Sequence, residues 1–226
     1  MKRKGFTLIE MVVVLAVVSI LVAILVPTIA RHIKDAKITR AENEELVIAS
    51  AILSLYKDVG RWPCTNANGP SGGVNRVLSG DVGDYVPPSA DPASYPGSAN
   101  WYSLNPTKQL HDYLYYNNPD NNTGAINQNE SGQDYPTTGE YRWKGPYLDK
   151  RANLDPWGAQ YVISARYFPG NSLTTVAQRA GHRVLILSPG INQVWETPFS
   201  DAVNRNTTPD DNVGGDDIGF VIYTND

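Results

Sequence analysis

An apolar stretch near the N-terminus limits what the rest of the chain can form more than any other feature. In the run 11–26 only Ser19 interrupts the apolar residues, and residues 6–9 extend the run toward the N-terminus. A helical segment of about 20 apolar residues, rising ~1.5 Å each, is long enough to cross the hydrocarbon core of a bilayer. We therefore expect residues 6–30 to form a single membrane-spanning helix.

Basic residues stand on both sides of this stretch. The Lys-Arg-Lys sequence at 2–4 favours a cytoplasmic N-terminus and an exported remainder. Four cations between positions 31 and 40 weaken that preference, so charge alone does not decide the orientation. A cleaved secretory signal is one alternative, but its apolar region is shorter and a small-x-small site follows it. Here the apolar pattern continues directly into a longer helix.

A plain membrane anchor is a second alternative, and Glu10 argues against it. A carboxylate inside an apolar span costs roughly 2.5–3.5 kcal/mol, and a mere anchor gains nothing in return. A subunit that must find a cation on a partner does gain, because pairing relieves the cost. The obvious cation is a free α-amino group on Phe6, which exists only if the chain is cut after Gly5.

Residues 4–10, Lys-Gly-Phe-Thr-Leu-Ile-Glu, resemble the class III signal of type IV pilins and type II secretion pseudopilins. The resemblance implies that residues 1–5 are a leader peptide, which a prepilin peptidase removes before it methylates Phe6. Glu10 matches the glutamate of the family motif, and Pro27 matches the proline that interrupts the family's helix. Pro27 also removes one backbone hydrogen bond and should allow a kink or local unwinding.

Helical spacing of apolar residues continues beyond the membrane segment. Residues 31–63 should form the amphipathic second half of one long helix, which Gly60 and Pro63 end. Two rows at spacings of three and four suggest a broad apolar face suited to packing on a sheet. The first row is Leu46, Ala49, Leu53 and Tyr56, and the second is Ile48, Ile52, Leu55 and Val59.

The middle of the chain differs in character. Residues 64–140 are dense in turn signals and predict a loop-rich insertion. Four aromatic residues there can either anchor the core of this lobe or recognise a partner or glycan, and the core is the favoured interpretation. They are Trp101, Tyr102, Tyr115 and Tyr116.

Three β-rich runs follow in residues 141–226, at 160–167, 183–187 and 218–223. Turn residues bound each run, which predicts a small antiparallel sheet. The expected fold class is therefore α+β and type IV pilin-like. In this fold a long N-terminal helix packs on a small C-terminal antiparallel sheet.

The order Gly-Pro-Tyr-Leu, Asp-Pro-Trp-Gly, Leu-Ser-Pro-Gly and an acidic loop resembles the major pseudopilin of type II secretion, the GspG family. The resemblance covers residues 1–63 and about 141–223, and the insertion makes this chain longer than a usual member. It implies a single-pass inner-membrane subunit with a periplasmic C-terminal domain. Such a subunit polymerises with itself and other pseudopilins on an inner-membrane assembly platform, and the filament drives export of folded proteins. The alternative is a type IV pilin or minor pilin of a surface filament.

Four carboxylates crowd the acidic loop: Asp210, Asp211, Asp216 and Asp217. No Lys or Arg lies between positions 206 and 226, so the carboxylates repel one another unless they are solvated or share a cation. Oxygen-only donors favour calcium over zinc, although turn formation alone also explains Asp and Asn here. The family resemblance implies calcium in this loop. It places Asn192 where the family has its first-arm aspartate, and Asp217 at the aspartate before the final isoleucine.

Two function classes are not expected. The net charge of −4 becomes more negative if the leader is lost, which disfavours nucleic acid as a partner. The three histidines (His32, His111 and His182) are scattered, and Cys64 is the only cysteine. No nucleophile–base pattern or phosphate-binding loop appears, so we do not expect an enzyme. A single cysteine also excludes an intrachain disulfide, which many type IV pilins use to close a C-terminal loop.

Overall fold

The structure is a computed structural model, and it describes residues 6–65, 73–80, 85–87, 107–119, 134–149, 154–197 and 213–225. The chain divides into two units, Met1–Arg40 and Ala41–Asp226, which are described separately. Helix α1 (Leu8–Val59) begins in the first unit and ends in the second.

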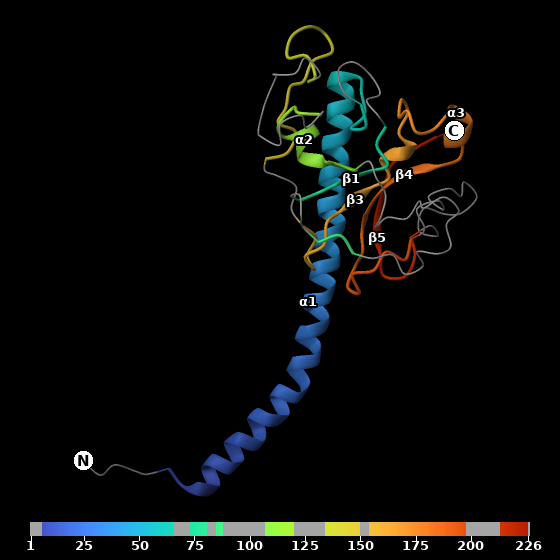
Figure 1. Ribbon diagram of the computed structural model, residues 1–226. Helices are drawn as coiled ribbons and strands as arrows, with labels where there is room; N and C mark the ends of the chain where they lie inside the picture. The colour runs from blue at the N-terminus through green and yellow to red at the C-terminus, as the bar shows by residue number, and fades with distance from the viewer. Residues whose placement is uncertain are drawn as a thin grey trace. The chain divides into compact units, whose positions relative to one another are not determined.

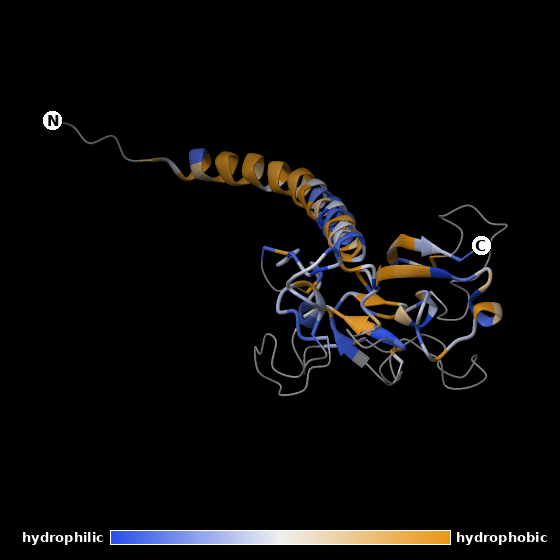
Figure 2. Cartoon of the chain, turned by 90° about the horizontal axis from the view of Figure 1, so that it is seen from above, coloured by the Kyte–Doolittle hydropathy of each residue, from blue (hydrophilic) through white to orange (hydrophobic). Residues whose placement is uncertain are grey.

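In the first unit, α1 is apolar over its early turns, as the orange ribbon near the N-terminus in Figure 2 shows. Every described side chain from Phe6 to Ala36 is exposed. Among the described residues, α1 is the one helix long and apolar enough to cross a membrane. Pro27 lies inside the helix, and the helical backbone continues on both sides of it.

The second unit is built on a five-stranded sheet in the order β2-β1-β3-β4-β5 (Figure 1). Its strands are β1 (Arg76–Leu78), β2 (Thr107–Gln109), β3 (Val162–Ile163), β4 (Arg183–Ser188) and β5 (Ile218–Thr224). Strands β1 and β2 pair in parallel, and the other three pairs are antiparallel. The α+β expectation is confirmed, but the sheet is mixed rather than purely antiparallel.

Three shorter helical elements complete the described fold. They are α2 (Leu110–Leu114), the 3-10 turn η1 (Ala165–Tyr167) and α3 (Val176–Arg179). The turn η1 shortens the expected strand 160–167 to two residues. Ser164 still exchanges hydrogen bonds with Leu185 of β4, because its backbone N–H donates to the Leu185 carbonyl at 3.0 Å. Its hydroxyl oxygen accepts from the Leu185 N–H at 2.8 Å.

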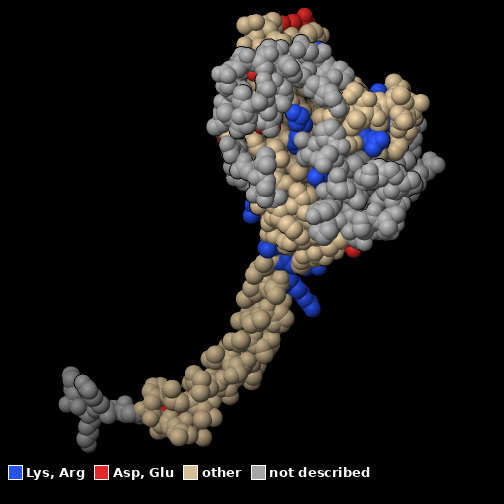
Figure 3. All heavy atoms as spheres, viewed as in Figure 1, with Lys and Arg blue, Asp and Glu red and all other residues tan. Residues whose placement is uncertain are grey.

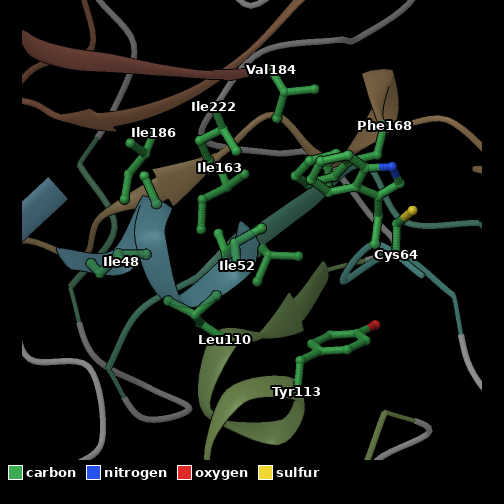
Figure 4. Packing of buried hydrophobic residues seen from close by; sticks show 14 of the residues in the cluster. Ile48, Ile52, Cys64, Leu110, Tyr113, Ile163, Phe168, Val184, Ile186 and Ile222 are labelled. Carbon is green, nitrogen blue, oxygen red and sulfur yellow. The ribbon is translucent and has the colours of Figure 1, made fainter. Parts of the chain in front are cut away.

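The core lies between α1 and the sheet, where Ile48 and Ile52 approach Ile163, Ile186 and Ile222 (Figure 4). All six residues of β4 are buried, which explains why its sequence reads as an unbroken apolar run rather than an alternating one.

Only one of the two apolar rows on α1 faces this core. The second row is buried: Ile48, Ile52, Leu55 and Val59. From the first row Ala49 is buried, whereas Leu46, Leu53 and Tyr56 are 41–51% exposed. At 3.6 residues per turn, Leu46 and Leu53 point roughly 140–160° away from Ile48, so one sheet cannot cover both rows. The expectation of a single broad apolar face was therefore wrong for three positions.

The middle segment contributes more to the sheet than its turn-rich composition predicted. Strands β1 and β2 and helix α2 all come from residues 64–140. Tyr135 is fully buried, and its hydroxyl donates to the carbonyl of Thr65. The Asn117 side chain donates to the Tyr135 carbonyl at 3.0 Å and accepts from the Tyr135 N–H at 3.1 Å. These bonds tie two parts of the segment together.

Candidate functional site

The first candidate site is the N-terminus of α1. Thr7 donates to Glu10 Oε2 twice, from its backbone N–H at 2.8 Å and from its hydroxyl at 2.6 Å. The Glu10 N–H approaches Thr7 Oγ1 at 3.4 Å. This is a capping box, in which the side chains of Thr7 and Glu10 each accept a hydrogen bond from the other residue's backbone N–H. These N–H groups have no partner inside the helix. The Glu10 carboxylate is thus held beside the first turn.

This arrangement bears on the expected cleavage. Phe6 is exposed and immediately precedes Thr7, whose N–H already contacts the Glu10 carboxylate. Consecutive Cα atoms are ~3.8 Å apart, so an amino group created on Phe6 would lie within reach of the same carboxylate. Gly5 lies outside the described residues. The geometry therefore permits charge neutralisation at this end of the helix after a cut before Phe6.

Pro27 is a local gap in the hydrogen bonds of α1. It has no N–H, so the carbonyl of Ala23 lacks the donor that an ordinary residue would supply. The next residue, Thr28, donates its hydroxyl to the carbonyl of Ile24 at 3.1 Å. The helix nevertheless remains continuous here. Pro27 therefore removes one backbone hydrogen bond that would otherwise resist stretching of the helix.

The second candidate site joins residues 189–197 to residues 213–217, and we call it the acidic clamp. Asp217 Oδ2 accepts from the N–H groups of Glu196 and Thr197, at 3.0 and 2.7 Å. Glu196 Oε2 accepts in return from the Asp216 N–H at 2.9 Å. Asp216 Oδ2 accepts from the Asn192 N–H, also at 2.9 Å. Carboxylates of both segments thereby bind backbone donors of the other segment.

Two glycines make this close approach possible. Gly190 and Gly215 have φ angles of 65° and 57°, in the left-handed region that glycine adopts without strain. A Cβ on Gly190 would collide with the backbone carbonyl of Asp216, and one on Gly215 would collide with the Glu196 carboxylate. The clamp therefore depends on both positions having no side chain.

The structure brings together three of the residues expected to bind calcium. Asn192, Asp216 and Asp217 all lie in the clamp, whereas Asp210 and Asp211 lie outside the described residues. The side-chain oxygen of Asn192, Oδ1, accepts from the Val194 N–H at 2.7 Å.

The donors of the clamp are of the kind that calcium binds. Asp217 Oδ1 is buried and receives no hydrogen bond from any residue that the structure describes, so one carboxylate oxygen remains for a cation or a proton. Within the described residues, however, no three His, Cys, Asp or Glu side chains converge as metal ligands would. A complete calcium site would need further oxygens, for which Asp210 and Asp211 are candidates.

Sequence reasoning missed Glu196 and two further acids near the clamp, Asp155 and Glu45. Asp155 begins the Asp-Pro-Trp-Gly turn, where its Oδ1 accepts from the N–H groups of Trp157 and Ala159 at 2.9 and 2.8 Å. Its Oδ2 accepts from the hydroxyl of Ser188, at the end of β4, at 2.7 Å. Only the position of this aspartate before a Pro-x-Gly turn signals such a role.

Burial raises the pKa of three acids in this region: Asp217, Asp155 and Glu45. It raises the pKa of Asp217 to about 7, against the opposing effect of hydrogen bonds from Thr197 and Glu196. Burial likewise raises the pKa of Asp155. The pKa of Glu45 is raised well above its usual range, first by burial and then by nearby carboxylates that include Asp155 and Asp217. We call the unit Ala41–Asp226 the head. Negative charge in this part of the head is thus poorly compensated by the described residues.

The remaining candidates do not form a catalytic site. His111 is buried, with Nδ1 3.1 Å from the Gly80 carbonyl, and His182 stacks on Tyr167. Cys64 is buried, and burial raises the pKa of its thiol to about 12. At such a pKa almost no reactive thiolate forms near neutral pH.

Of the four aromatic residues considered for partner recognition, the two that the structure describes belong to the packed interior. Tyr116 is buried and Tyr115 is half-buried against it, with ring centroids 4.8 Å apart. Trp101 and Tyr102 lie outside the described residues. A separate open depression of about 680 Å³ lies near the C-terminal end of α1, and Tyr56, Trp62 and Tyr141 are among its lining residues.

Comparison with known proteins agrees with the N-terminal geometry. The family model for the prokaryotic N-terminal methylation motif matches residues 1–26. The fimbrial protein EcpC of Eikenella corrodens is 33% identical over 88 residues, which are 39% of this chain and 56% of EcpC. A type IV major pilin protein PilE1 of Neisseria gonorrhoeae is 36% identical over 84 residues, 37% of this chain and 49% of the pilin. No solved structure matches the chain significantly.

A long N-terminal helix with a methylation motif, followed by a small sheet, makes the chain similar to pilin-like proteins. The motif and the curated relatives support the type IV pilin superfamily in particular. The chain spans about half the length of the curated relatives it matches. Those relatives are named as fimbrial and pilin proteins, which fits the expectation that the chain is not an enzyme.

Proposed function

We propose that this chain is a filament subunit that is processed after Gly5, held in the inner membrane by α1, and then assembled with copies of itself. The observation that carries the proposal is the contrast along α1. Its early turns expose many apolar side chains, and the carboxylate of Glu10 lies among them. Apolar surface of this extent requires lipid or another subunit to cover it.

Cleavage and assembly are coupled in this proposal. The intact chain satisfies Glu10 partly through Thr7, by way of the capping box. A prepilin peptidase that cuts before Phe6 creates an amino group beside this carboxylate, in the same subunit or a neighbouring one. Pairing removes much of the roughly 2.5–3.5 kcal/mol that a carboxylate costs inside an apolar span. Assembly is therefore favoured only after processing.

We further propose that the filament is a periplasmic pseudopilus of a type II secretion system, which forms on an inner-membrane platform and drives export of folded proteins. The Asp155 turn and the acidic clamp support this choice, because they are built from the motifs that resemble the secretion family. The lone, buried Cys64 agrees with it. The alternative, a pilin or minor pilin of a surface filament, is supported by the names of the relatives.

Calcium binding at the acidic clamp is a further part of the proposal. Asp217 Oδ1 is the observation that supports it, since this oxygen is buried and no described residue forms a hydrogen bond with it. Asn192, Asp210, Asp211 and Asp216 are the other candidate ligands. Burial opposes the ionisation of Asp217 in this cluster of acids. When bound, calcium would supply the positive charge that the cluster lacks.

Deletion of the gene tests the function directly. Loss of exported proteins with surface filaments intact supports a secretion pseudopilus, and the reverse result supports the pilus alternative.

Mass spectrometry of the mature chain tests the processing step. The expected mass corresponds to a methylated Phe6 start, and an intact Met1 would overturn the whole scheme.

A further inference from the structure

The basic residues that follow the apolar part of α1 take no part in the assembly mechanism proposed above. Within residues 31–40 there are four cations and one carboxylate, Asp35, a formal excess of three positive charges. The cations are Arg31, Lys34, Lys37 and Arg40. Figure 3 shows blue spheres gathered on the helix just where the uncharged stretch ends.

The length of the apolar segment sets the depth of the first two cations. Because α1 is continuous, Arg31 lies ~35 Å along the helix axis from Leu8, at ~1.5 Å per residue. The hydrocarbon core of a bilayer is about 30 Å thick, and the headgroup regions extend it to about 40–45 Å. Arg31 therefore lies at the edge of the core. Lys34 lies one turn farther, at the depth of the phosphates.

We infer that Arg31 and Lys34 bind the phosphates of anionic phospholipids in the leaflet at the C-terminal end of the span. Both side chains are exposed, so their long stems can lie along the helix while the charged ends reach the headgroups. The arginine guanidinium can hold a phosphate through two parallel hydrogen bonds. This inference rests on the proposed function only in that α1 spans a membrane.

Acids on a second copy of the chain are the other partner for these cations, and the structure favours lipid. Three glutamates follow on the next turns of α1, but one of them is hydrogen-bonded and another is buried within the same chain. Glu44 Oε2 accepts from the Tyr161 hydroxyl at 2.7 Å, and Glu45 is only 1% exposed. Lipid phosphate, in contrast, is present at the depth where the apolar segment ends.

The contact would regulate the order of events on the membrane. Before processing, basic side chains stand at both ends of the span; afterwards the N-terminal end keeps only the Phe6 amino group, which pairs with Glu10 in the proposed function. Basic side chains then face the headgroups of one leaflet only. Each cation near an anionic surface strengthens binding about fivefold, so entry into the filament must break a contact of measurable strength.

Lipid selectivity of the full chain in vesicles tests the inference. The leader cations are first replaced (Lys2→Gln, Arg3→Gln, Lys4→Gln), so that only the C-terminal end of the span carries basic residues. The protein is reconstituted in phosphatidylcholine vesicles with traces of spin-labelled phosphatidylglycerol or phosphatidylcholine. Electron paramagnetic resonance then gives the relative association of each lipid with the helix.

We expect phosphatidylglycerol to be preferred at least fivefold. The preference should fall with Arg31→Gln or Lys34→Gln and disappear with both together, whereas Arg31→Lys should retain most of it. Lys57→Gln, which removes the same charge farther along α1, is the matched control and should change nothing. Millimolar inorganic phosphate should not displace the lipid, because free phosphate is not held at the depth of the headgroups.

Two results would overturn the inference. One is a preference that survives the double substitution, or that Lys57→Gln reduces equally. The other is the absence of any lipid preference; a reduced filament yield of the double variant would then assign the cations to a second copy of the chain. The vesicle measurement does not depend on secretion or on filament identity, since it uses unassembled subunits. The proposed function would stand in both cases.

Discussion

The two halves of α1 obey the same helical geometry but differ in what covers their apolar residues. In the unit Ala41–Asp226, the row that includes Ile48 and Ile52 is buried against the sheet of its own chain. In the unit Met1–Arg40, every described side chain of the apolar stretch is exposed. Under the proposed function the first half is stabilised by lipid or other subunits, whereas burial within the chain's own fold stabilises the second.

Neighbouring residues of the second half give the largest test of this contrast. Ile52→Ala should lower the free energy of unfolding by about 2–5 kcal/mol, because it leaves a cavity between α1 and the sheet. Leu53→Ala, one residue later at a 45% exposed position, should change it by less than about 0.5 kcal/mol. Denaturant unfolding of the full chain in detergent measures both. Equal effects would mean that the buried row is assigned to the wrong face.

The pH dependence of the head follows from the acidic clamp. Folding raises the pKa of Asp217 from its ordinary 3.8 to about 7, so the folded state binds a proton more tightly than the unfolded state does. The contribution of Asp217 to stability is therefore fully present below about pH 4 and is lost as the pH rises to about 7. At ~1.36 kcal/mol per pKa unit, the loss amounts to at most about 4 kcal/mol.

Unfolding measured from pH 4 to 7 in the presence of a chelator checks this sign. Asp217→Asn should make the profile less steep, while Glu140→Gln, at an exposed position of the same unit, should leave it unchanged. A wild-type head that becomes more stable over the same range would contradict the assignment.

Glu10 tests the first half of the helix. Glu10→Ala should leave membrane insertion intact or improved, but it should reduce filament yield roughly a hundredfold, the equivalent of the ~2.5–3.5 kcal/mol that pairing relieves. Cell fractionation and filament counting measure the two effects separately. Glu42→Ala is the matched control on the same helix. An unchanged filament yield with Glu10→Ala would remove the pairing argument.

Calcium should have the smallest effect of the four, and only on the head. At a hundred times its dissociation constant, a ligand of the folded state adds about 2.7 kcal/mol to stability. The melting temperature of the full chain should therefore rise with calcium and fall back with chelator, and Asp217→Ala should abolish the rise. If calcium has no effect, the acidic residues serve as turn formers and clamp donors only.

The parts of the fold that could be predicted from the sequence are those with a long apolar run or a specific motif. The run at 183–187 could be recognised because β4 is buried throughout, and residues 4–10 carry a motif specific enough to be confirmed by the family model. The parallel pair of β1 and β2 could not be foreseen, because each strand has only three residues within a turn-rich segment. Short strands like these are selected by their tertiary partners rather than by local preference.

The candidate sites show the same limit. The motif identified Glu10, but its hydrogen bonds with Thr7 became visible only in three dimensions. Asp216 and Asp217 were expected as ligands, whereas Glu196 was not, because nothing local distinguishes it from a surface acid. Its role arises from the contact between residues 189–197 and residues 213–217. Contacts between segments twenty residues apart are not encoded in the spacing of either one.

The acidic clamp also changes how the C-terminal part of the chain is held closed. Asp217 is bonded to Glu196, 21 residues earlier, so the clamp closes a loop of the size that a disulfide commonly closes. A disulfide responds to the redox state of its compartment, and this chain has no second cysteine with which to form one. A closure made of carboxylates and backbone N–H groups responds instead to protons and, as proposed, to calcium. Closure of this kind needs no oxidising or reducing enzyme.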